Sequence, residues 1–343
     1  MKYRKIKVFI VDDSLFFRTT LEKLLSEDGY FEVIGSASSA IEAEKKIIEL
    51  NPDVVTLDEE MPGMRGSEFI KKFFPQHPIP MVLVSSLDMN VFEALQCGAI
   101  DFVKKPVISK SNDLASFANE LAIKIKIAAA AHISKSTKVN VSTQAPLKLQ
   151  SKSETIIAIG ASTGGTEATL EIVKQFPADF PPVLITQHMP AGFTQMYAER
   201  LNRLCNITVK EAVNGMRVEK GTAIVAAGDF HMTLEKDAKG YYVKSVHGEK
   251  VSGHCPSVDV LFQSVAKTAG ANTIGVILTG MGRDGANGLL EMHNKGAFTI
   301  GQEKDSCVVY GMPMEAFKLG AVDREAACEN IASIIINQLN KKG

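Results

Sequence analysis

Residues 6–13 read IKVFIVDD, a short apolar run that two aspartates close. A run of this length, bounded in this way, is typical of a buried strand in a parallel sheet. Similar strand-like runs follow at residues 33–37, 53–57, 81–84 and 101–103, with helical spacing at residues 16–25 and about 40–50. This alternation predicts a parallel sheet with helices on both faces, and five strands within about 125 residues fit the flavodoxin-like version of that fold.

A second block of alternating strands and helices begins after Thr155 with the run IIAIG. Further strand-like runs lie at residues 183–186, 222–226, 273–278 and 297–300, and residues 233–246 have the pattern of a hairpin that turns at Lys239-Gly240. The block is predicted to be a second doubly wound α/β domain, Rossmann-like, with an antiparallel hairpin.

The segment between the two blocks is rich in Ser, Thr, Lys and Gln, and its apolar residues lack periodicity. Such a composition favours a flexible linker. The predicted organisation is a first domain over residues 1–125, a linker over 126–152 and a second domain over 153–343.

The bulk composition narrows the classes of function. A formal net charge of −1 over 343 residues gives no overall field that would hold nucleic acid or an acidic membrane surface. The N-terminal apolar run is too short for a signal peptide, and no segment approaches the length of a membrane span. The five cysteines are scattered without a C-x-x-C pair, which argues against a disulfide framework or a zinc site. We expect a cytoplasmic monomer with reduced thiols.

Acidic residues gather at the strand ends of the first block. Asp12 and Asp13 follow the first strand and Asp58 closes the third, so their carboxylates are expected to meet in one crevice. Three carboxylates repel one another unless a cation lies among them, and Mg²⁺ prefers such ligands. Ser85 and Lys105 follow the fourth and fifth strands, where a hydroxyl and an ammonium group suit the oxygens of a phosphoryl group on Asp58. The alternative, that these are solvated turn residues or helix caps, explains any one of them better than all five together.

A serine occupies the corresponding place in the second block. Ser162 lies in a glycine-rich turn between the strand IIAIG and a helical pattern, where backbone N–H groups, those of Thr163 and Gly164 among them, can stabilise an oxyanion. His188 ends the next strand and is placed to act as a general base. Asp284, in the loop TGMGRDGANG, is the best candidate to orient that histidine, and the Met281 N–H of the same loop is a further candidate oxyanion donor.

Two alternative interpretations of this region are disfavoured. A glycine-rich turn that opens a helix also holds dinucleotides, but the next strand then ends in an acidic residue, and here it ends in Gln187 and His188. A nucleophilic pair of Cys255 and His254 is disfavoured because neighbours in sequence rarely point at each other. His231 lies near the same loops without an assigned role.

The first block resembles the receiver domain of bacterial response regulators. The matching strings over residues 5–125 are VDDS, LDEEMPGMRG, VSS and DFVKKP. The resemblance implies that Asp58 accepts a phosphoryl group from a histidine kinase and that Asp12, Asp13 and Asp58 hold Mg²⁺. It further implies that Ser85, Lys105 and Phe102 form the switch. Arg65 departs from the family pattern, which often has Asp there, but it lies off the predicted metal site.

The second block resembles the chemotaxis protein-glutamate methylesterases, the CheB family. The strings that match are IGASTGGTEA, QHMP, HCPSVDVLF, LTGMGRDGA and SCVVYGMPMEA. The resemblance implies a Ser162, His188 and Asp284 triad that removes methyl esters from glutamates of chemoreceptors and deamidates receptor glutamines, without a cofactor in this domain. It also implies activation by phosphorylation of the receiver. AAGD at residues 226–229 departs from the pattern, where a proline is expected. An esterase that serves another sensory array and a non-enzymatic receiver-linked binding module are the alternatives.

Overall fold

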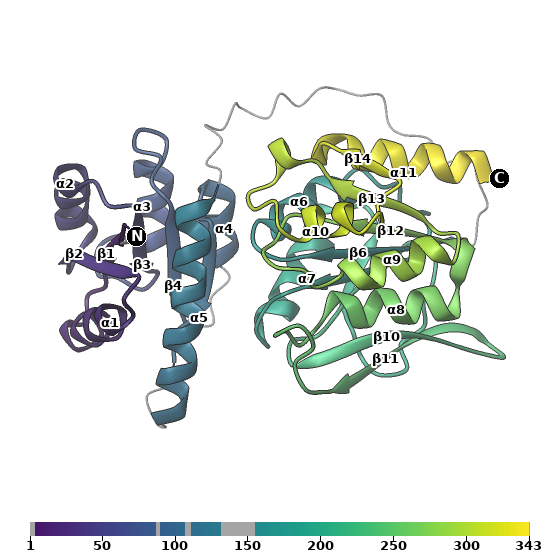
Figure 1. Cartoon of the computed structure of the whole chain (residues 1–343), viewed down its shortest axis with the longest axis horizontal. Helices are drawn as coiled ribbons and strands as arrows, with labels where there is room; N and C mark the ends of the chain where they lie inside the picture. Colours follow the sequence, from purple (N-terminus) through teal and green to yellow (C-terminus); the bar gives the residue numbers. More distant parts are fainter. Residues whose placement is uncertain (1–3, 87–89, 107–110, 132–154, 343) are drawn as a thin grey trace. The chain divides into compact units, whose positions relative to one another are not determined.

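The computed structural model describes residues 4–86, 90–106, 111–131 and 155–342. The chain divides into two compact units, Met1–Asn140 and Val141–Gly343, and each is a parallel-sheet α/β domain (Figure 1). The predicted fold class is therefore confirmed for both.

The N-terminal unit is a five-stranded parallel sheet in the order β2-β1-β3-β4-β5. This is the flavodoxin-like strand order, in which the first strand lies inside the sheet. The strands are β1 (Ile6–Val11), β2 (Phe31–Ala37), β3 (Val54–Asp58), β4 (Met81–Ser85) and β5 (Asp101–Lys104). The helices are α1 (Leu15–Glu27), α2 (Ala40–Leu50), α3 (Gly66–Phe73), α4 (Asn90–Cys97) and α5 (Ser111–Ala130).

Two packing layers enclose this sheet. Helix α1 contacts α5, whereas α3 contacts both α2 and α4, so each face of the sheet is covered. Strands β3 and β4 are buried along their whole length, as expected for central strands of a two-sided parallel sheet. Helix α5 continues to Ala130, so residues 126–130 of the predicted linker are helical. Most of the predicted linker, residues 132–152, lies outside the described residues.

The C-terminal unit contains a seven-stranded parallel sheet in the order β14-β13-β12-β6-β7-β9-β8. Its strands are β6 (Ile156–Ala161), β7 (Val183–Gln187), β8 (Thr208–Glu211), β9 (Thr222–Val225), β12 (Thr273–Ile277), β13 (Phe298–Gln302) and β14 (Arg324–Ala326). The short edge strands β8 and β14 were not predicted. The first strand of this unit, β6, lies in the middle of the sheet, so the strand order reverses there and a crevice is expected at the carboxyl ends of the central strands.

Helices cover both faces of the larger sheet. They are α6 (Gly165–Val173), α7 (Phe193–Leu204), α8 (Val258–Thr268), α9 (Ala286–Asn294), α10 (Met312–Lys318) and α11 (Cys328–Lys342). Helix α6 packs against α7 and α11, and α9 packs against α8 and α10. Short 3₁₀ turns, η1 (Gly270–Asn272) and η2 (Lys304–Ser306), precede β12 and follow β13.

The predicted hairpin is present as β10 (Phe230–Asp237) and β11 (Gly240–His247). Its pairing is antiparallel and in register from Phe230 opposite His247 to Asp237 opposite Gly240. Met232, Leu234 and Val243 of the hairpin share one apolar core with α8 (Figure 1). The hairpin thereby fixes the position of the α8 helix, whose N-terminus reaches the site described below.

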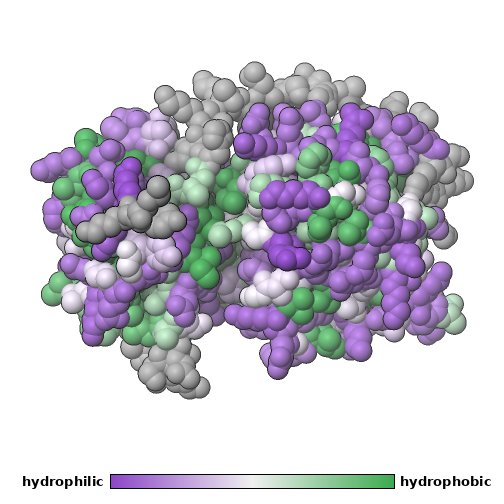
Figure 2. Space-filling model, in the orientation of Figure 1, coloured by the Kyte–Doolittle hydropathy of each residue, from purple (hydrophilic) through white to green (hydrophobic). Residues whose placement is uncertain are grey.

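The surface is mostly polar. In Figure 2 hydrophilic residues cover most of the visible faces of both units, and apolar residues form separate areas. Within the described ranges, no helix combines the length and the apolar character that crossing a membrane requires.

Candidate functional site

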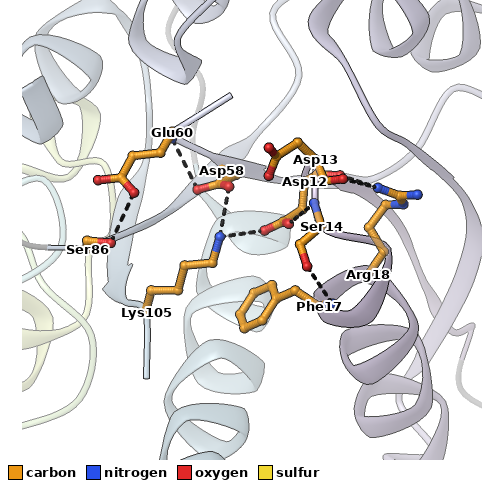
Figure 3. A network of polar contacts seen from close by, with 9 residues as sticks. All are labelled: Asp12, Asp13, Ser14, Phe17, Arg18, Asp58, Glu60, Ser86 and Lys105. Carbon is orange, nitrogen blue, oxygen red and sulfur yellow. Dashed lines mark hydrogen bonds and ion pairs between the residues drawn. The ribbon is translucent and has the colours of Figure 1, made fainter. Parts of the chain in front are cut away.

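The predicted acidic cluster of the N-terminal unit is assembled. Asp12 follows β1 and Asp58 ends β3, and both side chains are buried, whereas Asp13 is exposed. Ligand oxygens of the three carboxylates lie within 4.8 Å of one another, close enough to share one cation (Figure 3). An all-carboxylate donor set at this spacing fits a hard divalent ion such as Mg²⁺.

Lys105 neutralises part of this charge. Its ammonium group lies 2.9 Å from Asp12 Oδ2 and 2.8 Å from Asp58 Oδ2, and it also lies over the ring of Phe17 (Figure 3). Burial raises the pKa of Asp58 and the Asp12 charge adds to it, while the hydrogen bond from Lys105 opposes the shift; the pKa is about 6. The site therefore holds more negative charge than its lysine compensates.

Ser85 and Phe102 lie where the sequence placed them. Ser85 ends β4 and is buried, and its hydroxyl has no hydrogen-bond partner among the described residues. Leaving a buried hydroxyl without a hydrogen-bond partner costs folding free energy, so this position fits a hydroxyl that donates to a ligand oxygen. Phe102 on β5 is 5% exposed and faces the interior.

Supporting contacts around the acidic cluster were not predicted. Arg18 of α1 donates to the backbone carbonyls of Asp12 and Asp13, at 2.6 and 3.0 Å (Figure 3). Glu59 is fully buried next to Asp58 and accepts hydrogen bonds from the Ser67 N–H and hydroxyl, both at 2.8 Å. These contacts fix the two loops that carry the acidic residues.

The three candidate residues of the C-terminal unit follow three neighbouring strands. Ser162 follows β6, His188 follows β7 and Asp284 lies in the loop after β12, and β6 pairs with both of the other strands. The topology therefore brings together residues that are up to 122 positions apart, the difference between 284 and 162.

His188 and Asp284 are hydrogen bonded, as predicted. Nε2 of His188 lies 2.7 Å from Asp284 Oδ2, and both side chains are buried. The other ring nitrogen, His188 Nδ1, is buried without a hydrogen-bond partner in the described part of the chain. A carboxylate on Nε2 favours the tautomer with its proton there, which leaves the Nδ1 lone pair available to accept a proton.

Asp284 is held by more donors than the sequence suggested. Its two carboxylate oxygens accept from the Ser257 hydroxyl at 2.8 Å, from Val258 N–H at 2.8 Å and from Asp259 N–H at 3.1 Å. These groups form the N-terminus of α8, where the helix dipole also favours a negative charge. Burial alone raises the pKa of Asp284, but the donors, with His188 foremost, outweigh it and hold the pKa below its ordinary value. Asp284 therefore stays ionised at neutral pH.

Ser162 lies in a tightly packed turn. Its N–H donates to Thr279 O at 3.0 Å, and Gly280 packs so closely that a Cβ there would lie 2.6 Å from the Ser162 Cβ. Gly164, the N-terminal cap of α6, has φ +78°, which a residue with a side chain rarely adopts. The Ser162 side chain is 7% exposed, and its hydroxyl makes no hydrogen bond to His188 in the described structure.

The candidate oxyanion donors flank this serine. The N–H groups of Gly164 and Met281 donate to no other group within the described residues. The Thr163 carbonyl accepts from the Thr279 hydroxyl at 3.0 Å, which pins the turn. Met281 is 47% exposed, so its loop borders solvent.

Both competing interpretations of the region lose support. At the end of β7, the Gln187 amide donates to Ser162 O at 2.8 Å and to His188 O at 3.3 Å, so the position braces the turn rather than offering an acid to a ribose. Burial raises the pKa of the Cys255 thiol, which disfavours a thiolate nucleophile. The His254 ring stacks on His188.

His231 supports the same loop. Its Nε2 lies 2.8 Å from the Glu249 carbonyl, and its Nδ1 accepts from the Ser257 N–H at 3.3 Å. His231, Ser257 and His254 were not predicted to belong to the site. His254 and Ser257 lie in the string HCPSVDVLF that resembles the family pattern, and Ser257 precedes the helical run that starts at Val258, as a typical helix cap does.

A receiver-type acidic site on one α/β unit and a serine, histidine and aspartate site on the other define a class of two-domain, receiver-linked α/β protein. The model of the CheB methylesterase family matches residues 157–335, and that of the response regulator receiver domain matches residues 8–117. The chain belongs to the CheB methylesterase family.

Whole-chain relatives agree with this assignment. A protein-glutamate methylesterase/protein-glutamine glutaminase 2 of Syntrophomonas wolfei is 51% identical over 342 residues, 99% of this chain and 100% of that protein. A protein-glutamate methylesterase/protein-glutamine glutaminase of Syntrophotalea carbinolica is 44% identical over 349 residues, 99% of each chain. The crystal structure of the Thermotoga maritima CheB methylesterase catalytic domain is similar at a TM-score of 0.53 with 35% identity, over 54% of this chain and 98% of that one.

Proposed function

We propose that this protein is a phosphorylation-activated protein-glutamate methylesterase and protein-glutamine deamidase that acts on chemoreceptors during chemotaxis adaptation. The observation that carries the proposal is the buried 2.7 Å contact between His188 and Asp284 beside Ser162, at the carboxyl ends of three adjacent strands. The names of the whole-chain relatives supply the substrate class.

The proposed reaction begins when the Ser162 hydroxyl attacks the γ-carbonyl carbon of a glutamate methyl ester. His188 Nδ1 takes the hydroxyl proton, because Nε2 is bound to Asp284. The tetrahedral oxyanion receives hydrogen bonds from the free N–H groups of Met281 and Gly164. When the intermediate collapses, the C–O bond to the methoxy group breaks and His188 returns the proton, which releases methanol and leaves an acyl-enzyme.

Water completes the cycle by the same groups in reverse order. His188 removes a proton from water, the hydroxide attacks the acyl carbon, and Ser162 leaves with the proton from His188. Glutamine deamidation follows the same path with ammonia as the leaving group. Asp284, kept ionised by the α8 donors, stabilises the imidazolium in each step.

The proposed control lies in the receiver. Asp58 accepts a phosphoryl group from a histidine kinase, and Lys105 and Ser85 bind its oxygens, which would give the unpaired Ser85 hydroxyl a partner. Asp12, Asp13 and Asp58 would hold Mg²⁺, which supplies positive charge against the phosphoryl oxygens. Because the proposed partners are a histidine kinase and the helices of chemoreceptors, the proposed activity is cytoplasmic.

Labelling with a fluorophosphonate tests the nucleophile independently of the receptor. We expect the probe to modify Ser162 in the wild-type protein, to leave Ser162→Ala unmodified and to react slowly with His188→Ala. Labelling that persists in Ser162→Ala would contradict the assignment. A protein that is neither labelled nor releases methanol from methylated receptor membranes would instead support a binding module.

A further inference from the structure

A second histidine lies against the proposed base. The rings of His188 and His254 are parallel within 8°, and their centroids are 3.6 Å apart. Neutral aromatic rings prefer offset or edge-to-face arrangements at larger centroid distances, because direct overlap brings their electron-rich faces together. The two histidine rings therefore overlap face to face, so the His254 ring covers one face of His188.

Proton transfer changes the balance of this contact. When His188 accepts the proton of Ser162, its ring becomes a cation, and a neutral ring against its face then attracts it through the cation–π interaction. The stack is thus worth more in the transition state than in the ground state, which is the condition for an interaction to raise the rate. Asp284 binds Nε2 at the edge of the same ring, at 2.7 Å, so different residues contact the edge and the face of His188.

The chain holds His254 in place. His254 and Val251 exchange backbone hydrogen bonds, each of 3.0 Å, and the two residues between them, Ser252 and Gly253, have φ of +52° and +85°. Two successive positive φ angles characterise the tight turn that joins hairpin strands. Because backbone hydrogen bonds in both directions close this turn, the backbone that carries the His254 ring is fixed.

The same segment also holds Asp284. Three residues after His254, Ser257 begins the set of donors that bind the Asp284 carboxylate, and His231 accepts from the Ser257 N–H. One short stretch of chain therefore fixes the face of the base and its acidic partner together. A substitution that removes the ring without disturbing Ser257 separates the two contributions.

We propose that His254 is a positioning residue of the esterase site: the face of its ring holds His188 in the plane that joins Asp284 to Ser162 and stabilises the imidazolium form. The inference rests on the proposed function, because it requires His188 to accept a proton. It assigns His254 no contact with the reacting atoms.

The test uses the full-length protein and compares His254→Ala, which removes the ring, with His254→Phe, which keeps an aromatic face. His293→Ala is the matched control. His293 pairs with Asp323 at 3.2 Å, and Asp323 also accepts from the Thr299 N–H near the start of β13, away from the site. Methanol release from methylated receptor membranes gives kcat and KM, the fluorophosphonate labelling rate reports Ser162 without receptor, and thermal melting checks folding.

We expect His254→Ala to lower kcat and the labelling rate roughly tenfold, with KM unchanged, and His254→Phe to recover most of the loss. His293→Ala should match the wild type. The inference is overturned if folded His254→Ala keeps the wild-type kcat, if only KM changes, or if His254→Phe loses as much as His254→Ala. Failure of the proposed function is recognised separately, by a wild-type protein that neither releases methanol nor labels at Ser162.

Discussion

Asp58 and Asp284 are two buried carboxylates, each near the carboxyl end of a parallel strand, and their surroundings are opposite. Asp58 shares one ammonium group with Asp12, and its pKa rises to about 6. Asp284 accepts from a hydroxyl, two backbone N–H groups and an imidazole, and its pKa is lowered. Both carboxylates are buried, so the donors around each one, together with the Asp12 charge beside Asp58, set the opposite directions of the two pKa shifts.

The difference matches two kinds of chemistry. An under-compensated carboxylate such as Asp58 gains from a cation and from a ligand that brings new donors, which suits a residue that is modified. A fully compensated carboxylate such as Asp284 has no reason to react and instead holds a neighbour in place. Each of the following predictions tests one side of this contrast.

The largest expected effect is at the base. His188→Ala removes the group that accepts the Ser162 proton, so methanol release should fall on the order of 10⁶-fold while the melting temperature changes little. The measurement is single-turnover methanol release with the phosphodonor present. A loss smaller than about a hundredfold would show that another group removes the proton.

Replacing the compensated carboxylate, Asp284, should lower kcat by a smaller factor. Asp284→Asn keeps the shape but removes the charge that stabilises the imidazolium and selects the tautomer, so we expect a loss of about 10⁴-fold in kcat. The α8 donors would still bind the amide oxygen, which preserves the fold. A kcat within tenfold of wild type would mean that Asp284 only supports the α8 terminus.

Removing a single hydrogen-bond donor to Asp284 should lower kcat by a still smaller factor. Ser257→Ala removes the 2.8 Å hydroxyl contact and the helix cap, and a hydrogen bond to a charged group is worth enough to lower kcat roughly tenfold. Ser333→Ala, at a half-buried serine of α11 whose hydroxyl donates to the Asn330 carbonyl of the same helix, is the control. Equal kcat in both variants would show that the remaining donors suffice.

The smallest effect is on stability and comes from Asp58. Its carboxyl titrates at an ordinary value of 3.8 in the unfolded chain and at about 6 when folded, so the folded state binds more protons between these values. Stability should therefore fall as the pH rises from 4 to 6 in a chelator. Asp58→Asn should remove this pH dependence and melt a few degrees higher at pH 7.5.

The effect of Mg²⁺ on the melting temperature provides a complementary experiment. Mg²⁺ should raise the melting temperature of the wild-type receiver more than that of Asp58→Asn, because binding to the folded state adds stability. A pH dependence that survives in Asp58→Asn would contradict the account of this carboxylate.

Much of the architecture was readable from the sequence because buried parallel strands are continuous apolar runs. The runs at IKVFIV and IIAIG ended within a residue of β1 and β6. Asp12 directly follows the first run, and Ser162 lies two residues after the second. Strands β8 and β14 were missed because they are three or four residues long and lie at the edges, where one side is solvated. Helix α5 extends to Ala130, into the segment that was assigned to the linker.

The supports of the sites could not be predicted in the same way. Ser257 and His254 meet Asp284 and His188 only through the packing of α8 and the hairpin against the sheet. Such contacts depend on rotamers and on helix placement, which local patterns do not encode. Arg18 and Glu59 act on backbone groups, for which residue types give no specific signal.

The central claim is that phosphorylation at Asp58 controls ester hydrolysis at Ser162. It is tested most directly by methanol release from methylated receptor membranes, with and without a small phosphodonor and Mg²⁺, for the wild type, Asp58→Asn and Ser162→Ala. We predict stimulation of the wild type, unstimulated basal release by Asp58→Asn and no release by Ser162→Ala. Stimulation that persists in Asp58→Asn, or methanol release by Ser162→Ala, would contradict the account.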